Sequence, residues 1–264
     1  MSTINEISKK LSPYRKVFLV YRNEWHIKHH DKTSYSAGKI LSLLFQMAPI
    51  NSLLDVGCGH GDWLHAAHEH GAHEVIGCDG PWTDLNRLLI PRENFHCVDL
   101  REALQLDRKF DLVLCLEMAE HIPEENAATL VKSLTAHGDM VFFGAAIPYQ
   151  GGYHHVNEQW PSWWSARFAE QGFQHFDLVR RAIWDDPSVH FWYKQNALLY
   201  VRAGREDLMA RAKELEGNGA LPLDIVHPEK YLWSASYRSI SFKPLLRALP
   251  EAIIGKAKSL MREP

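Results

Sequence analysis

Cysteine and long apolar runs are both scarce in this sequence of 264 residues. None of the four cysteines belongs to a C-x-x-C pair, which excludes a zinc ribbon and a C-x-x-C redox motif. No apolar run reaches ~18 residues, so no membrane-spanning helix is predicted. Residues 1–15 are polar and lack the apolar core of a signal peptide. These features predict a cytoplasmic protein whose cysteines are reduced, small core residues, namely Cys58, Cys78, Cys97 and Cys115.

Excess charge is also lacking. The formal net charge is −3, which argues against a broad nucleic-acid-binding surface, although a local basic patch stays compatible with it. No internal repeat or low-complexity segment is present. With 46% hydrophobic and 23% charged residues, the composition is that of a globular protein, and the length suits one large α/β domain with additions.

The most informative stretch is an apolar strand, 50–56, that runs into three glycines at every second position, Gly57, Gly59 and Gly61. A helix is predicted at 62–70, immediately after them. Glycine lets the backbone approach a ligand closely, and the new helix directs free N–H groups toward it. The stretch therefore predicts a nucleotide-binding element. Its spacing differs from the G-x-G-x-x-G of dinucleotide-binding folds.

The pattern Asp55-x-Gly57-x-Gly59-x-Gly61 resembles motif I of the class I S-adenosylmethionine (SAM) methyltransferases. The resemblance implies that SAM is the cofactor and that the glycine turn passes under its methionine part. Carried onto this sequence, the family's SAM-binding positions are Asp55, Gly57, Cys58, Gly59, Gly61, Asp79, Gly80, Asp99, Leu100, Leu116 and Glu117.

Two acids follow the next strands at the positions where the family contacts the nucleoside. Asp79 ends an apolar strand, and the resemblance implies that it accepts hydrogen bonds from both ribose hydroxyls, a task that suits a carboxylate. Asp99, with the Leu100 N–H, matches the position that contacts the adenine amino group. Each acid has a structural alternative: Asp79 could be a turn residue before Gly80, and Asp99 a helix N-cap.

From residue 50 onward, strands alternate with helices, which predicts an α/β fold with a mostly parallel sheet. By resemblance we expect a Rossmann-like class I methyltransferase core at 49–202, with seven strands, an antiparallel last hairpin and helices on both faces. Residues 1–48 are expected to form an N-terminal lid or helical extension, and 203–264 a C-terminal helical extension. Predicted strands are 50–56, 74–79, 95–98, 110–116, 140–146, 173–181 and 193–201. Predicted helices are 35–47, 62–70, 101–106, 123–136, 162–171 and 206–216, and 222–237 is predicted to be a loop.

Two clusters of polar residues lie where the acceptor would bind. The first is Glu117-x-x-Glu120-His121 after the fourth strand, whose three side chains share one face of a helical turn. The second is a loop after the fifth strand that contains His154 and His155. Carboxylates combined with imidazole suit a divalent cation such as Mg²⁺ or Mn²⁺.

This pairing resembles the ubiquinone-biosynthesis O-methyltransferases and the small-RNA 3′-terminal 2′-O-methyltransferases. The second group binds a divalent metal through Glu-x-x-Glu-His and a later His. Carried over, the metal ligands would be Glu117, Glu120, His121 and either His155 or His154. Two alternatives stay open. In one, His121, His154 or His155 acts as a catalytic base without a metal; in the other, the cluster only lines the acceptor pocket.

The acceptor is predicted to be a hydroxyl of a sugar, glycan or small molecule. A resemblance to methyltransferases of bacterial polysaccharide and natural-product pathways favours it, as do Trp160, Trp163, Trp164, Trp184 and Trp192, which could stack on sugar rings or pack in the core. An RNA 3′-terminal ribose and a non-catalytic SAM-binding subunit are the alternatives. Residues 242–262 form a basic amphipathic segment that could contact a membrane surface, its own domain or a partner chain. The oligomeric state is left open.

Overall fold

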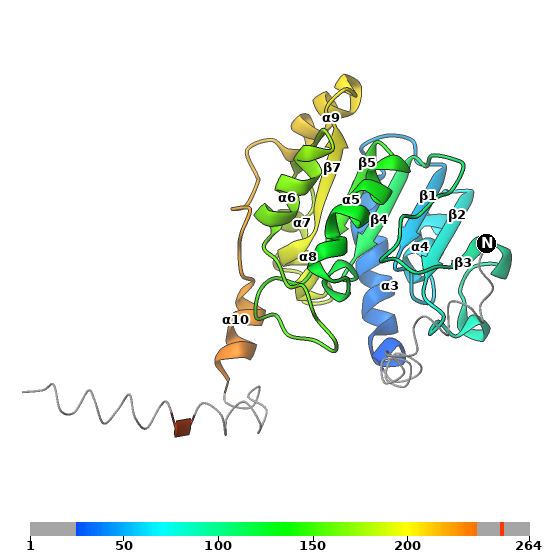
Figure 1. Cartoon of the computed structure of the whole chain (residues 1–264). Coiled ribbons are helices and arrows are strands. Elements are labelled where there is room, and N and C mark those ends of the chain that lie inside the picture. The colour runs from blue at the N-terminus through cyan, green and yellow to red at the C-terminus, as the bar shows by residue number, and fades with distance from the viewer. Residues whose placement is uncertain (1–24, 237–248, 251–264) are drawn as a thin grey trace, which may run out of the picture. The chain divides into compact units, whose positions relative to one another are not determined.

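A seven-stranded sheet in the order β3-β2-β1-β4-β5-β7-β6 runs through the computed structural model, which describes residues 25–236 and 249–250 (Figure 1). β7 is antiparallel to β5 and β6, and the other neighbours are parallel. The predicted Rossmann-like sheet with an antiparallel last hairpin is confirmed. The strands are β1 (Ser52–Val56), β2 (Glu74–Asp79), β3 (Phe95–Cys97), β4 (Leu112–Leu116), β5 (Met140–Gly144), β6 (Phe173–Phe176) and β7 (Leu198–Arg202).

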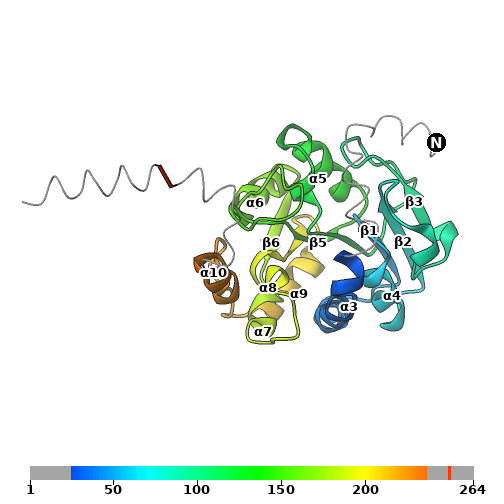
Figure 2. The same cartoon turned by 90° about the horizontal axis from the view of Figure 1, so that it is seen from below.

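Helices cover both faces of the sheet, and each face has its own apolar core (Figure 2). Side chains of the central strands alternate between the cores, so that Leu53 packs into one and Leu54 into the other, as strand geometry requires. On the first face lie α3 (Trp25–Leu44), α4 (Asp62–Glu69), α7 (Arg180–Ile183), α8 (Phe191–Asn196) and α9 (Glu206–Glu216). On the second lie α5 (Ala127–Ala136) and α6 (Pro161–Glu170).

The centre of the sheet brings the candidate site residues to one edge. β1 pairs with β2 on one side and with β4 on the other. Successive strands are therefore added in opposite directions on the two sides of the β1–β4 pair. Ligands of open α/β sheets bind at the carboxyl ends of strands beside such a switch point. At the opposite ends, the Asp111 carboxylate accepts hydrogen bonds from the Asn51 and Ser52 N–H groups, both at 2.9 Å, and so joins β1 to β4. Asp111 therefore has a structural role.

The helix predicted at 101–106 is wrong, since this segment is turn and irregular backbone. Two of its backbone N–H groups donate to side chains at α5 instead of to carbonyls within the segment. The Leu104 N–H donates to Ser133 Oγ at 3.0 Å, and the Leu106 N–H donates to His137 Nε2 at 2.9 Å. Because a backbone N–H given to a neighbouring element is lost to helix formation, tertiary contacts decide this segment.

The last two predicted strands are too long. The strand predicted at 173–181 ends at Phe176, and Asp177 then accepts a hydrogen bond from the Arg180 N–H at the start of α7. The strand predicted at 193–201 begins only at Leu198, because residues up to Asn196 form α8. Gln195 and Asn196 belong to one polar network, which adjacent residues of a strand could not share, since their side chains point to opposite faces.

The chain divides into two compact units, Met1–Ile225 and Val226–Pro264. In the first unit, the fully buried Arg180 holds the segment 221–223 against the fold. Its guanidinium pairs with Asp177 at 3.0 Å and donates to the carbonyls of residues 221–223. In the second unit, α10 (Pro228–Ala235) lies in the segment predicted to be a loop, and that prediction is wrong. Proline in its first turn favours this helix start.

Some predictions concern residues outside the described range. Residues 1–24 of the predicted N-terminal lid or extension lie there, and so does the basic amphipathic segment at 242–262, apart from residues 249 and 250. Within the described residues, no helix is long and apolar enough to cross a membrane.

Candidate active site

The glycine turn after β1 has the backbone shape that the sequence pattern predicts. Gly57, Gly59 and Gly61 have φ angles of +90°, +54° and +92°, which side-chain-bearing residues rarely adopt. The Gly57 N–H donates to the Cys78 carbonyl at 2.8 Å and so ties the turn to β2. A Cβ on Gly57 would lie 2.3 Å from Met118 Cγ, so packing as well as conformation requires glycine here.

Asp79 lies against this turn at the end of β2. Its two carboxylate oxygens accept hydrogen bonds from the Gly59 N–H at 2.7 Å and from the Gly80 N–H at 2.6 Å. Burial raises the pKa of Asp79, and these two N–H donors lower it. The Trp82 side chain also donates a hydrogen bond to this carboxylate, and a remaining lone pair could accept one from a ligand hydroxyl beside the glycine turn.

Asp99 is held differently from Asp79. The Arg101 guanidinium forms a two-point ion pair with it, through Nε at 2.9 Å and Nη2 at 2.6 Å. The alternative of an N-cap is excluded for Asp99, because no helix follows. Of the other predicted SAM-binding residues, Asp55, Cys58, Leu100 and Leu116 are buried, and burial raises the pKa of Asp55.

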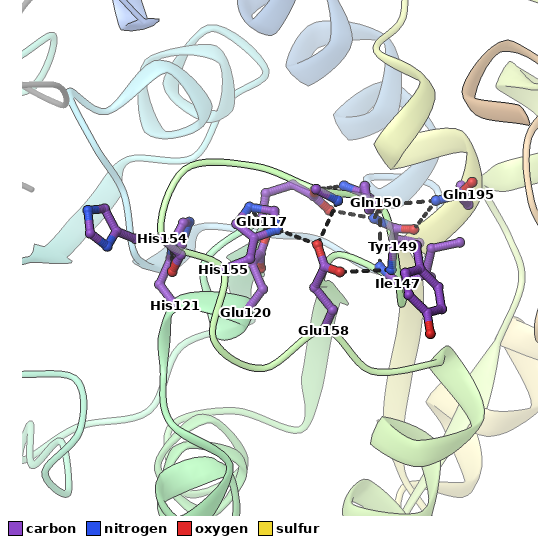
Figure 3. A network of polar contacts seen from close by, with 12 residues as sticks. Glu117, Glu120, His121, Ile147, Tyr149, Gln150, His154, His155, Glu158 and Gln195 are labelled. Atoms are coloured by element: carbon purple, nitrogen blue, oxygen red, sulfur yellow. Dashed lines mark hydrogen bonds and ion pairs between the residues drawn. The ribbon is translucent and has the colours of Figure 1, made fainter. Parts of the chain in front are cut away.

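Glu117 follows β4 in a left-handed conformation with φ +50°, which places its carboxylate in a network of amide side chains (Figure 3). It accepts hydrogen bonds from Asn196 Nδ2 at 2.8 Å and from Gln150 Nε2 at 2.9 Å. Gln195 Nε2 in turn donates to Gln150 Oε1 and to Asn196 Oδ1. Because both amides donate to Glu117, the network favours its ionised form, whereas burial acts against that form and raises its pKa to about 7.

A second group lies one turn further along the chain, where Glu120 and His121 meet His155 (Figure 3). One ligand atom from each residue lies within 4.8 Å of the others, which is a suitable spacing for a metal ion. Glu120 is almost completely buried, and its Oε2 has no hydrogen-bond partner. Burial, followed by the nearby charge of Glu117, raises the pKa of Glu120 well above its ordinary value. Backbone N–H groups of Glu120 and Ala146 offset part of this rise, but a buried carboxylate oxygen without a partner is costly unless a cation or a hydrogen-bond donor joins it.

The hydrogen bonds of the two histidines fix which ring nitrogen carries the proton. His155 Nδ1 lies 2.8 Å from Glu158 Oε1, and His121 Nδ1 lies 3.2 Å from the His154 carbonyl. Both partners only accept hydrogen bonds, so each Nδ1 is protonated and each neutral ring keeps its lone pair on Nε2. His155 Nε2 lies 3.9 Å from Glu120 Oε1. Burial and then the neighbouring His155 lower the pKa of His121 to about 4, so its ring is neutral near pH 7.

The Glu158 carboxylate and the Glu120 carbonyl hold the loop that carries His155. Glu158 accepts hydrogen bonds from the N–H groups of Tyr149 at 2.8 Å and Gly151 at 2.7 Å, besides the bond to His155. The Val156 and Asn157 N–H groups donate to the Glu120 carbonyl at 2.9 and 3.0 Å. Glu158 thus orients a histidine that could bind metal, in the manner of a carboxylate–histidine pair.

Residues 6–182 match a family model described as a methyltransferase domain. The chain belongs to this methyltransferase family.

Curated relatives of the methyltransferase match a shorter region. Ubiquinone biosynthesis O-methyltransferase from Coxiella burnetii is 30% identical over 104 residues, and that from Acinetobacter baumannii is 34% identical over 102 residues. Each alignment covers 34% of this chain and 42% of the relative, so the chain spans about two fifths of the length of these proteins.

Solved structures show the same fold at low identity. The crystal structure of Streptomyces venezuelae DesVI has a TM-score of 0.52 and 15% identity, covering 68% of this chain and 95% of that chain. Magnesium protoporphyrin IX methyltransferase (ChlM) from Synechocystis PCC 6803, with bound SAH, has a TM-score of 0.50 and 19% identity, covering 74% and 95%. The prediction of a class I methyltransferase is therefore confirmed.

Only some of the residues predicted for the acceptor side lie close together in the fold. Glu120, His121 and His155 converge, whereas the Glu117 carboxylate lies in the amide network and is not in that cluster. The His154 side chain is exposed, and this residue contacts His121 through its carbonyl. Of the five tryptophans predicted to stack on sugar rings, Trp164 is fully buried against Phe143, which leaves it no face for a sugar. The other four of this set are partly buried, namely Trp160, Trp163, Trp184 and Trp192.

Sequence reasoning missed the positioning role of Gln150, and it left Glu158 without a role. No local pattern marks Gln150, since its amide meets Glu117 and Asn196 only after folding. The adjacent pair Gln195-Asn196 was a visible signal, because two amides next to each other are costly to bury without mutual hydrogen bonds.

Proposed function

We propose that this chain is a SAM-dependent O-methyltransferase that acts on a hydroxyl of a sugar, a glycan or a small molecule with the help of a divalent cation. The family supports methyl transfer. The glycine turn, Asp79 and the ends of β1, β2 and β4 are the groups that would hold SAM. The curated relatives are named as O-methyltransferases, which favours oxygen as the methylated atom.

The convergence of Glu120, His121 and His155 around the unpartnered Glu120 Oε2 supports the metal most directly. The donor set fits Mg²⁺ or Mn²⁺, because it combines a carboxylate oxygen with two imidazole nitrogens. A divalent cation bound there would polarise the acceptor hydroxyl and lower its pKa. The sequence resemblance adds Glu117 as a fourth ligand, and that assignment remains a prediction.

The protein's own groups have separable tasks in this proposal. Glu158 holds the ring of His155 and the loop beneath it. Gln150 and Asn196 hold Glu117 as an acceptor of hydrogen bonds at the end of β4. An acceptor hydroxyl that donates to Glu117 would be aligned for in-line attack and could pass its proton to this carboxylate.

Residues 1–48 are proposed to cover the cofactor site. The described part of this segment, α3, reaches the first residue of α4: His30 Nδ1 lies 2.5 Å from Asp62 Oδ1, and Ser34 Oγ donates to the same oxygen at 3.2 Å. Asp62 directly follows the glycine turn, so this contact links the N-terminal helix to the proposed methionine-binding backbone. The C-terminal residues 203–264 are proposed as a helical extension.

The experiment that tests this proposal is a calorimetric titration. The protein is stripped with a chelator and titrated with Mg²⁺, Mn²⁺ or Zn²⁺ in the presence of S-adenosylhomocysteine. Wild type is compared with Glu120→Gln and with Glu125→Gln, an exposed position that loses the same charge. We expect one metal per chain in wild type and in Glu125→Gln, and roughly 100-fold weaker binding in Glu120→Gln.

Other outcomes would redirect the assignment. Binding of S-adenosylhomocysteine without metal binding in any variant would rule out the metal site and leave a direct base such as Glu117 or a histidine. Metal binding together with salt-dependent RNA binding would favour a 3′-terminal ribose as acceptor. Tight SAM binding with no methyl transfer to any hydroxyl acceptor tested would favour a non-catalytic SAM-binding subunit.

A further inference from the structure

Helix α10 exposes three consecutive large apolar side chains. The exposed fractions of Tyr231, Leu232 and Trp233 are 64%, 67% and 56%, values found at few other large apolar residues in the described ranges. The helix is well formed at its start, where His227 Nδ1 accepts a hydrogen bond from the Glu229 N–H at 3.2 Å. Monomeric proteins seldom expose neighbouring large apolar side chains without a partner surface, so we expect α10 to be an interaction site.

The side chains of α10 have the composition of a membrane interface. Tyr231 and Trp233 each combine an apolar ring with one polar group, a character that enriches these residues at the level of lipid headgroups. Lys230 is buried, and its Nζ lies 4.1 Å from the centre of the Trp233 ring, so this cation packs against the ring and is not part of the exposed surface. Leu232 adds a purely aliphatic side chain between the two rings, which the acyl region of a bilayer could accept.

The sign of the charge differs between the two units of the chain. Residues 226–264 contain seven Lys and Arg against three Asp and Glu, a net charge of +4. Residues 1–225 contain 22 Lys and Arg against 29 Asp and Glu, a net charge of −7. A basic segment is attracted to anionic lipid headgroups, and an acidic one is not. The positive charge of the chain is thus concentrated in the unit that carries the exposed aromatic residues.

We propose that α10 docks on an anionic lipid surface, lying in the interface without crossing it. Tyr231, Leu232 and Trp233 would enter the headgroup region, and the net charge of +4 in the sequence of residues 226–264 would favour an anionic surface. A second copy that pairs through its own α10 is a poorer partner, because two units of net charge +4 would repel each other. A nucleic acid could use the charge and the rings, but it has no aliphatic region to cover Leu232.

The test is sedimentation with vesicles. The full chain is mixed with phosphatidylcholine vesicles that contain either no phosphatidylglycerol or about a third of it, at low and at high salt. Wild type is compared with the double variant Leu232→Ser/Trp233→Ser. The control is Tyr35→Ser/Leu89→Ser, which removes two exposed large side chains from the first unit. Thermal unfolding and S-adenosylhomocysteine binding verify that all three proteins are folded.

We expect wild type and the control to bind the anionic vesicles, more weakly at high salt, and the α10 double variant to bind roughly tenfold less or weaker still. Three results would overturn the proposal: no binding of wild type to either vesicle, equal loss of binding in the control and the α10 variant, or concentration-dependent dimerisation of wild type that the α10 variant abolishes. None of these readouts requires methyl transfer, so the docking surface and the proposed enzyme activity can fail independently.

Discussion

The two halves of the candidate site are built from different parts of the polypeptide. The cofactor side is backbone: a turn of five residues, Gly57 to Gly61, and the N–H groups that Asp79 accepts. The acceptor side is made of side chains from segments that span residues 117 to 196, and the loop 149–158 brings them together. A site made of backbone is sensitive to substitution at a small number of positions, here the glycines. A site made of side chains is sensitive at many positions that lie far apart in the sequence.

Both halves bury carboxylates, and they differ in how these are satisfied. Asp79 accepts hydrogen bonds from two backbone N–H groups within 2.7 Å, and these donors offset part of the rise in pKa that its burial causes. Glu120 has an oxygen with no partner, and its pKa is raised. The acceptor side therefore has a stronger electrostatic need for a ligand than the cofactor side, and this imbalance can be tested.

The largest effect is expected on the cofactor side, from Gly57→Ala. The added Cβ would meet Met118 Cγ at 2.3 Å in a backbone of positive φ, so the turn must shift. We expect S-adenosylhomocysteine affinity, measured by calorimetry, to fall roughly 100-fold. Gly71→Ala is the matched control, because its φ is also positive, at +103°, but nothing lies within 4 Å of its added Cβ. Equal losses in both variants would contradict the role of packing at Gly57.

The second effect concerns pH and the acceptor side. The pKa of Glu117 is raised from 4.5 to about 7 in the folded chain. Between these values the unfolded chain ionises while the folded chain keeps the proton, so the free energy of unfolding falls as pH rises and levels off above pH 7. Glu117→Gln removes this dependence, and we expect wild type to lose about 3 kcal/mol more than the variant over that range.

Chemical denaturation at several pH values, with chelator present, measures this difference. Glu120 has a raised pKa too, and part of that rise comes from the charge of Glu117, so Glu117→Gln also lowers the Glu120 pKa and adds to the difference between the two profiles in the same direction. Glu125→Gln serves as the control, because this glutamate is exposed and should leave the wild-type profile unaltered. Parallel profiles for wild type and Glu117→Gln would show that the amide network compensates the burial of Glu117 completely.

The smallest effect is expected from Glu158→Gln. Its carboxylate orients His155 and holds the N–H groups of Tyr149 and Gly151, but it is not in the metal cluster. We expect metal affinity to fall by about tenfold, as for other residues that support a ligand, with S-adenosylhomocysteine affinity unchanged. A loss as large as that of Glu120→Gln would mean that Glu158 binds the metal itself.

The sequence was sufficient for the cofactor side because its determinants are local. The strand, the glycines and Asp79 follow one another between residues 52 and 79, and positive φ at Gly57 and Gly61 is what glycine at those positions implies. The mostly parallel sheet followed from the alternation of strands and helices, and its antiparallel last hairpin from the family resemblance. Errors occurred where tertiary hydrogen bonds overrode local preference, as at 101–106, whose N–H groups bond to side chains at α5.

The acceptor side was predictable only in residue type. The motif that includes Glu120 and His121 is local, and its chemistry can be read from sequence, but the choice between His154 and His155 depends on the loop. His154 has a φ of +59°, and its carbonyl, not its ring, faces His121. The partners of Glu117 come from residues 33 and 79 positions further along the chain, and no periodicity connects them.

The buried Arg180 determines where the polypeptide can be shortened. Its guanidinium donates to the carbonyls of residues 221–223, far beyond the last strand, which ends at Arg202. A variant truncated after Arg202 would remove three acceptors and leave a buried cation with Asp177 and the Gln195 carbonyl alone. A variant truncated after Ile225 would keep every one of these bonds. Protein engineers who wish to isolate the catalytic unit should therefore choose the later position, even though no strand and no predicted SAM-binding residue lies between the two.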